Sequence, residues 1–324
     1  MDERYVSTGH LPEPVDVEAL VAEAFDRYRG NSDGAVSDVY PALARQRADA
    51  FAISVVGTDG VVSEVGEAGV EFTIMSVSKP FVFALVCEEL GPEGIRDAVG
   101  VNGTGLPFDS VTAIEQSPDG RTNPMVNPGA IATASLVSGA DVGERWEHVC
   151  STLAGFAGRE LALDEDVYVS ASSTNARNRG IARLLESYGG LGCPADEAVD
   201  LYTRQCSLAV TAHDLAAMGA TLADGGVNPL TGERVVDAET ARHTLAVMTT
   251  AGLYETSGEW IYDVGLPGKS GIGGGIVTVA PGKGGLGTFA PLLDAAGNSV
   301  KGRLVARFLS RRLGLDLLGS EPAE

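Results

Sequence analysis

The distribution of strand and helix patterns along the chain constrains the fold most. Residues 51–65 form two short apolar runs around an Asp-Gly turn, a pattern typical of a β-hairpin. Strand patterns return only near the other end of the chain, at 272–280 and 285–289, whereas helical patterns dominate from about 100 to 248. Strands from both ends therefore belong to one sheet, and the helices between them are an insertion.

This arrangement predicts an α/β fold with two subdomains in a single domain. A chain of 324 residues can form one large domain or two. We predict one domain, 1–324, in which an antiparallel sheet subdomain of about 1–75 and 250–318 carries an all-α subdomain of about 76–249. A cleft between two such parts is a favourable place for a ligand site.

Composition and charge exclude several function classes. The formal net charge of −21 argues against nucleic-acid binding, which needs a basic surface. No apolar run approaches ~18 residues and the N-terminus does not resemble a signal peptide, so we expect a cytoplasmic protein with no membrane association. The spacing of the cysteines and histidines indicates neither a metal site nor a disulfide framework. These residues are Cys87, Cys150, Cys193, Cys206, His10, His148, His213 and His243.

Ser76 and Lys79 stand at the start of a predicted buried helix and could act as a nucleophile and its base. Residues at i and i+3 of a helix share a face, so Lys79 can reach the Ser76 hydroxyl. A serine hydroxyl needs a base to take its proton, and burial, a helix N-terminus and a second cation all favour a neutral lysine. The apolar neighbours Ile74, Met75 and Phe81 favour burial. The same pattern also arises by chance in many helices.

Two further short motifs follow in the chain. Lys269-Ser-Gly271 directly precedes a predicted glycine-rich strand, and Ser173-Thr-Asn175 lies between the two outer motifs. The order Ser-x-x-Lys, Ser-x-Asn, Lys-Ser-Gly is that of the penicillin-recognising serine enzymes. Three-residue patterns are common, so a coincidental set of three stays an alternative at this point.

Longer strings carry a more specific resemblance. The nine residues 123–131 read Asn-Pro-Met-Val-Asn-Pro-Gly-Ala-Ile, similar to Asn-Pro-Met-Val-Asn-Ala-Gly-Ala-Ile of the serine-dependent glutaminases. The strings at 223–235, 265–271 and 294–302 resemble other stretches of that family, and the resemblance runs from 34 to 313. It implies a β-lactamase-like fold and hydrolysis of L-glutamine to L-glutamate and ammonia without a cofactor. It also implies a homo-oligomer, either a homodimer or a homotetramer.

The resemblance implies catalytic roles for specific residues. Ser76 would attack the side-chain amide and form a glutamyl ester, and Lys79 would accept the Ser76 proton. Tyr254 would sit beside the nucleophile and help protonate the leaving ammonia. The backbone N–H groups of Ser76 and Ile272 would form an oxyanion hole, worth several kcal/mol for two preorganised donors.

The resemblance also implies a substrate-binding set. It consists of Asn127, Asn178 and Tyr202, together with Ser76, Tyr254 and Ile272. Amides and a phenol suit a zwitterionic head group because they offer donors and acceptors without a fixed charge. Each of these residue types is also common as a cap, a turn residue or a core residue.

The chain departs from the family pattern at three places. Met75 stands where the family has a substrate-contacting glutamine, and Ala171 stands where it has a glutamate that pairs with the substrate α-ammonium group. The family's active-site tyrosine aligns with Val39, and the adjacent Tyr40 would point to the opposite face of an extended segment. All three changes fall at head-group positions, so we expect hydrolysis to be retained and head-group recognition to be altered.

Three function classes remain open from the sequence. The first is a glutaminase. The second is a serine amidohydrolase of the same fold that acts on another γ-amide or a lactam. The third is a non-catalytic amino-acid-binding protein, against which the presence of Ser76, Lys79 and Lys269 argues.

Overall fold

A five-stranded antiparallel sheet forms one part of the protein. The computed structural model describes residues 14–319, and the strand order is β2-β1-β7-β6-β5, with every neighbouring pair antiparallel. The strands are β1 (Ala52–Gly57), β2 (Val62–Gly66), β5 (Gly268–Ser270), β6 (Gly275–Ala280) and β7 (Gly284–Phe289). Both chain ends thus contribute to one sheet, which confirms the predicted α/β fold.

Helices cover both faces of this sheet. On one face lie α1 (Pro14–Tyr28), α11 (Ser257–Val264) and α12 (Val300–Arg312), packed over β1 side chains such as Ile53 and Val55. On the other face lies α9 (Ala212–Ala223), where Ala216 and Ala220 pack on Val56. Neighbouring strand residues point to opposite faces, so Val55 and Val56 serve the two cores separately.

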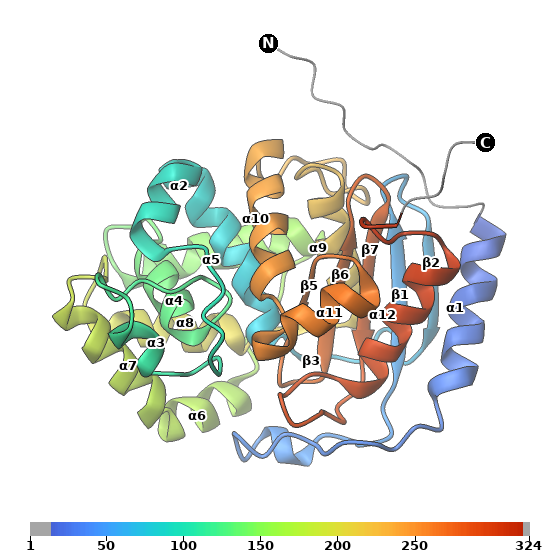
Figure 1. Ribbon diagram of the computed structural model, residues 1–324, viewed down its shortest axis with the longest axis horizontal. Helices are drawn as coiled ribbons and strands as arrows, with labels where there is room; N and C mark the ends of the chain where they lie inside the picture. The colour runs from blue at the N-terminus through green and yellow to red at the C-terminus, as the bar shows by residue number, and fades with distance from the viewer. Residues whose placement is uncertain (1–13, 320–324) are drawn as a thin grey trace, which may run out of the picture.

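The remaining helices form a second part beside the sheet (Figure 1). Here α2, α4, α5, α7 and α8 gather at one end of the molecule, and α10 lies between them and the sheet. The elements are α2 (Lys79–Val99), α3 (Thr112–Glu115), α4 (Asn127–Ser135), α5 (Val142–Ala157), α6 (Glu165–Thr174), α7 (Ala176–Ser187), α8 (Ala195–Cys206) and α10 (Ala238–Ala251). Two short strands, β3 (Phe72–Thr73) and β4 (Ala209–Val210), pair at the junction.

Most predicted elements are present, with one shift that matters for the site. The strand expected over 272–280 begins only at Gly275, because 271–274 form a turn closed by a hydrogen bond from Gly271 N to Gly275 O. Gly274 has φ +93°, a conformation that ends regular strand geometry. The residue limits of the two subdomains stay a prediction. Helix α9 comes from the predicted helical segment, yet it packs on the sheet.

Glycines in β7 allow α9 to approach the sheet closely. A Cβ on Gly285 would lie 2.3 Å from both Ala216 O and Ala220 N, and one on Gly287 would lie 2.1 Å from Ala212 O. These contacts are with helix backbone, which cannot move aside as a flexible side chain can. The small residues of β7 are therefore a packing requirement of this sheet–helix contact.

We expect Gly285→Ala to lower the free energy of unfolding by about 1–3 kcal/mol, because the added methyl group overpacks the α9 contact. The matched control is Gly180→Ala, inside α7, where an added Cβ meets nothing within 4 Å. There the substitution should stabilise the protein by roughly 0.5–1 kcal/mol through helix propensity. Thermal and denaturant unfolding of both variants will measure this. Equal effects of the two substitutions would contradict the packing argument.

Candidate active site

Ser76 lies on a sharp turn at the start of α2. A short 3₁₀ turn, Met75–Ser78, leads directly into the helix, and Ser76 is buried. Met75 adopts φ +49°, a left-handed conformation that costs a non-glycine residue about 1–2 kcal/mol. A Cβ on Gly271 would come within 3.2 Å of Ser76 N, so the end of β5 lies directly against this turn. The helix start at Ser76 was predicted, whereas nothing in the sequence signals the strain at Met75.

Lys79 is buried and held by oxygen atoms of the α4 region. Its Nζ donates to Asn127 Oδ1 at 2.7 Å and to Met125 O at 3.3 Å. The expected reach to Ser76 is not realised as a hydrogen bond within residues 14–319, although catalytic contacts often tighten only with substrate bound. Burial lowers the pKa of Lys79 from 10.5 to about 7, so a large fraction of it is neutral near neutral pH.

Lys269, from β5, is a second buried lysine in the same region. Its Nζ donates to Ser270 O at 2.7 Å and lies 4.1 Å from the centre of the Tyr254 ring. Burial lowers the pKa of Lys269 far below its usual value, and the charge of Lys79 lowers it further. The charge of Lys79 thus disfavours protonation of Lys269, whereas the pKa of Lys79 itself is lowered by burial.

Tyr254 stands between the nucleophile and the β5 strand. It begins the 3₁₀ turn Tyr254–Thr256 with φ +55°, the second non-glycine residue in the left-handed region among residues 14–319. Its hydroxyl donates to Ser270 O at 3.2 Å. Burial raises the pKa of Tyr254, and hydrogen bonds to Ser76 and Ser270 oppose that rise only in part. The phenol therefore stays protonated and is placed to exchange a proton with Ser76.

Three of the predicted binding residues form one hydrogen-bonded network around Lys79. Asn127 Oδ1 accepts from Lys79 Nζ and from Tyr202 OH, the latter at 3.0 Å, while Asn127 Nδ2 donates to Asn178 Oδ1 at 3.0 Å. The helices α4, α7 and α8 each contribute one of these three side chains. The Asn127 backbone also donates to Phe108 O at 2.7 Å, which ties the network to the loop before α3.

A cavity of about 180 Å³ opens above Ser76 and this network. Of the seven predicted site residues, Ser76, Asn127, Asn178, Tyr202 and Ile272 line it. Lys79 and Tyr254 lie outside the lining, next to residues that belong to it. Ile272 lies in the turn between β5 and β6 and not on a strand, which corrects the sequence prediction for that residue.

The Ser-x-Asn motif does not contribute its serine to the site. Ser173 is exposed, and its hydroxyl donates to Ser170 O within α6. Asn175 lines the cavity, where its amide donates to Thr203 Oγ1 at 2.9 Å. The side-chain hydrogen bond of Lys79 goes to Asn127 Oδ1, which also accepts from Tyr202 OH.

All three departures from the family pattern lie on the cavity wall. Met75 and Ala171 line it, and so do both Val39 and Tyr40. The expectation that Tyr40 would point away was wrong, because 39–42 form a turn and not an extended segment. Burial raises the pKa of Tyr40 to about 12, so it offers a neutral hydroxyl to the cavity.

Three further residues line the cavity but belong to no motif that the sequence analysis identified. Phe108 and Asp109 come from an irregular loop, and Arg177 lies at the start of α7. The Phe108 ring lies 4.7 Å from the Tyr254 ring, and Arg177 Nε donates to Asp109 O at 3.0 Å. The only sequence signal was the position of Arg177 directly before Asn178.

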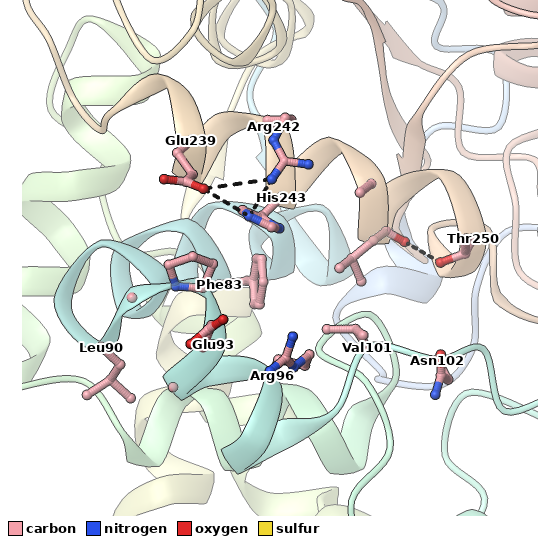
Figure 2. A pocket seen from close by; sticks show the side chains of 15 residues that line it. Phe83, Leu90, Glu93, Arg96, Val101, Asn102, Glu239, Arg242, His243 and Thr250 are labelled. Atoms are coloured by element: carbon pink, nitrogen blue, oxygen red, sulfur yellow. Dashed lines mark hydrogen bonds and ion pairs between the residues drawn. The ribbon is translucent and has the colours of Figure 1, made fainter. Parts of the chain in front are cut away.

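A larger hollow of about 830 Å³ lies elsewhere, between α10 and the kinked end of α2 (Figure 2). Its wall includes Glu239, Arg242 and His243, which pair with one another. None of its lining residues is a serine, cysteine, tyrosine or lysine. Of these two cavities the smaller is therefore the candidate active site, because it places a buried serine next to a buried lysine of lowered pKa.

Two general features concern metals and membranes. Within residues 14–319, no group of three or more histidine, cysteine or acidic side chains is placed to hold a metal ion, and His10 lies outside the described residues. Over the same part of the chain, no helix has both the length and the apolar character needed to span a bilayer.

Comparison with known proteins found a matching family model and similar proteins over most of the chain. The Glutaminase family model matches residues 34–318. "Glutaminase 2" of Yersinia pestis is 66% identical over 318 residues, covering 98% of this chain and 94% of the relative. "Glutaminase" of Colwellia psychrerythraea is 44% identical over 302 residues, covering 93% and 97% respectively.

Solved structures agree with this family assignment. "Probable glutaminase ybaS" superposes with a TM-score of 0.93 at 42% identity, covering 95% of this chain and 100% of that chain. The structure of "Mglu in its glutamate form" superposes with a TM-score of 0.86 at 37% identity, covering 97% and 71%. The predicted fold family is thereby confirmed.

The low pKa of Lys79 predicts a pH-dependent stability difference between the wild type and Lys79→Met. In the unfolded chain the lysine pKa is near 10.5 and in the folded chain about 7, so the folded state binds fewer protons between these values. The wild type should therefore gain stability relative to the variant as pH rises from 7 to 10, by on the order of 4 kcal/mol.

Unfolding of both proteins at pH 7, 8.5 and 10 will measure this difference. Loss of packing and of the Asn127 hydrogen bond shifts the variant by a constant amount, so the slope with pH is the test. A difference that stays constant over this range would contradict a neutral buried Lys79.

Proposed function

Because this chain belongs to the glutaminase family, we propose that it hydrolyses L-glutamine to L-glutamate and ammonia through an ester on Ser76, with Lys79 as the base. The family assignment makes the chain an amidohydrolase. The observation that carries the proposed mechanism is the position of Ser76, which lies at the base of an amino-acid-sized cavity beside Tyr254 and a buried amine of low pKa.

The first step is attack of Ser76 Oγ on the side-chain amide carbon. The Ser76 proton passes to neutral Lys79, directly once substrate tightens the site or by way of the Tyr254 hydroxyl. The carbonyl oxygen becomes an oxyanion, which accepts hydrogen bonds from the N–H groups of Ser76 and Ile272. The close approach of Gly271 to Ser76 supports this pairing, because it brings the two backbone segments together.

The second step expels ammonia and restores the serine. Collapse of the tetrahedral intermediate breaks the C–N bond, and the nitrogen leaves as ammonia after taking a proton from Tyr254 or protonated Lys79. Water then attacks the glutamyl ester, loses its proton to Lys79, and releases L-glutamate and the Ser76 hydroxyl. The raised pKa of Tyr254 suits a proton donor that does not remain ionised.

The cavity suits a small polar substrate. Its volume of about 180 Å³ is below the range of about 300–1,000 Å³ that is typical for drug-sized ligands. Asn127, Asn178 and Tyr202 offer donors and acceptors that already form a connected network. The reaction as written needs no cofactor. A homodimer or homotetramer stays a prediction.

A second candidate follows from the altered cavity wall. Met75 and Ala171 line the cavity and have neither an amide nor a carboxylate group. This less polar wall favours another γ-amide or a lactam as the second candidate substrate of the same machinery. A non-catalytic binding protein is disfavoured, because keeping two lysines buried with lowered pKa costs stability that simple binding does not require.

Ser76→Ala should abolish ammonia release from L-glutamine, with a loss of at least about 10³-fold, because no other group can form the ester. The matched control is Ser173→Ala, which removes the exposed serine of the Ser-x-Asn motif and should keep wild-type activity. Coupled detection of ammonia and L-glutamate will measure both. Turnover that survives in folded Ser76→Ala would overturn the proposed nucleophile.

The pKa of Lys79 also sets the pH dependence of the reaction. Below about pH 7 the amine is protonated and cannot accept the Ser76 proton, so kcat/KM should fall about tenfold per pH unit and be roughly 100-fold lower at pH 5 than at pH 8. Above pH 7 it should level off, because Tyr254 keeps its proton. Initial rates at low substrate between pH 5 and 8.5 will measure this. A flat profile would argue against Lys79 as the base.

A further inference from the structure

The wall of the cavity above Ser76 carries one pair of oppositely charged side chains. Among the lining residues, only Asp109 and Arg177 carry formally charged side chains. Both are partly exposed, with side-chain exposures of 38% for Asp109 and 56% for Arg177, so they stand at the mouth and not at the base near Ser76. Resting on the function proposed above, we propose that the Asp109 carboxylate binds the α-ammonium group of the substrate and is a specificity-determining residue of this enzyme.

The position of Asp109 is fixed by contacts on both sides. Arg177 Nε donates to Asp109 O at 3.0 Å and lies 3.4 Å from Asp109 Oδ2. The preceding residue, Phe108, accepts a hydrogen bond from Asn127 N at 2.7 Å and packs its ring against Tyr254. The loop that carries the carboxylate is therefore tied to the residues that surround the nucleophile.

The carboxylate keeps capacity for a ligand. Its contact with Arg177 uses Oδ2, and no other side chain among residues 14–319 pairs with Asp109. A carboxylate can accept about four hydrogen bonds, so Oδ1 can accept from an ammonium group without breaking the existing pair. The field of Asp109 also reaches the catalytic amine, since its charge opposes the burial effect on the pKa of Lys79.

The pair matches the charges of a free α-amino acid. Such a molecule carries an ammonium and a carboxylate on one carbon, and here an acid and a guanidinium lie 3.4 Å apart at the mouth. The rest of the wall is neutral: its amides and hydroxyls can orient the head group but supply no counter-charge for the ammonium. Ala171, on the same wall, presents only a methyl group.

The test compares two substrates that differ only in the amino group. With L-glutamine, Asp109→Asn should raise KM about ten- to a hundredfold through loss of a charge-assisted contact, with kcat within a few-fold of wild type. With glutaramate, which has the same γ-amide but no ammonium group, the wild type and Asp109→Asn should have equal kcat/KM. The matched control is Asp119→Asn, an exposed aspartate in the same region that does not line the cavity, and it should behave as wild type.

A variant with the carboxylate moved to another position tests whether Asp109 binds the ammonium group through its charge. In Asp109→Asn, the additional change Ala171→Glu places a carboxylate elsewhere on the wall and should lower KM for L-glutamine again. Asp109→Glu, which keeps the charge, should lose less than Asp109→Asn. An unchanged KM in Asp109→Asn would overturn the inference. An equal loss with glutaramate would do so too, because it would show a merely structural role.

Binding separates this inference from the proposed function. If the wild type releases no ammonia from L-glutamine, the proposed function fails, but calorimetry with L-glutamine and L-glutamate on Ser76→Ala still decides the role of Asp109. In the Ser76→Ala background, the additional change Asp109→Asn should weaken the binding of both amino acids about ten- to a hundredfold. Equal affinities, or no binding of either amino acid, would overturn the inference.

Discussion

The burial of Lys79 against Asn127 is the interaction on which the rest of the site depends. Asn127 Oδ1 accepts from both Lys79 Nζ and Tyr202 OH, so one oxygen links the amine that we propose as the base to the phenol that we propose for substrate binding. The amine stands at the start of α2, is fully buried, and has a pKa that this burial lowers to about 7. A base that works at neutral pH thus results from packing of the helical part, and not from a neighbouring acid.

Backbone strain brings the chemical groups together from the two parts of the fold. Met75 and Tyr254 both adopt a positive φ, and both flank Ser76, one in sequence and one in space. Across from them, the glycines after β5 let the strand end approach the Ser76 turn within contact distance of backbone atoms. The energetic cost of these conformations is met by the sheet and the α2 helix, which are rigid and well packed.

The sequence predicts the proposed catalytic residues better than it predicts the residues that line the cavity wall. Ser76, Lys79, Tyr254 and the sheet built from both chain ends follow from strings and periodicity, because motifs and apolar patterns are local signals. Asp109 lies on an irregular loop with no periodic pattern, and its approach to the cavity depends on tertiary hydrogen bonds. Tyr40 was misplaced for the same reason, since the alternation rule holds for strands and the segment is a turn.

The groups proposed for the reaction and the charged pair proposed for recognition therefore lie in different parts of the site. The proposed nucleophile, amines and oxyanion donors come from the 3₁₀ turn before α2, the start of α2, β5 and the turn after β5, where a Cβ added to Gly271 would meet backbone. Asp109 and Arg177 come from a loop and a helix start at the mouth, whereas Met75 directly precedes Ser76 and Ala171 lies within α6. Substitution at the mouth leaves the buried network intact, because none of its hydrogen bonds runs through those side chains. Head-group recognition can thus change during evolution while the acyl-transfer machinery stays constant.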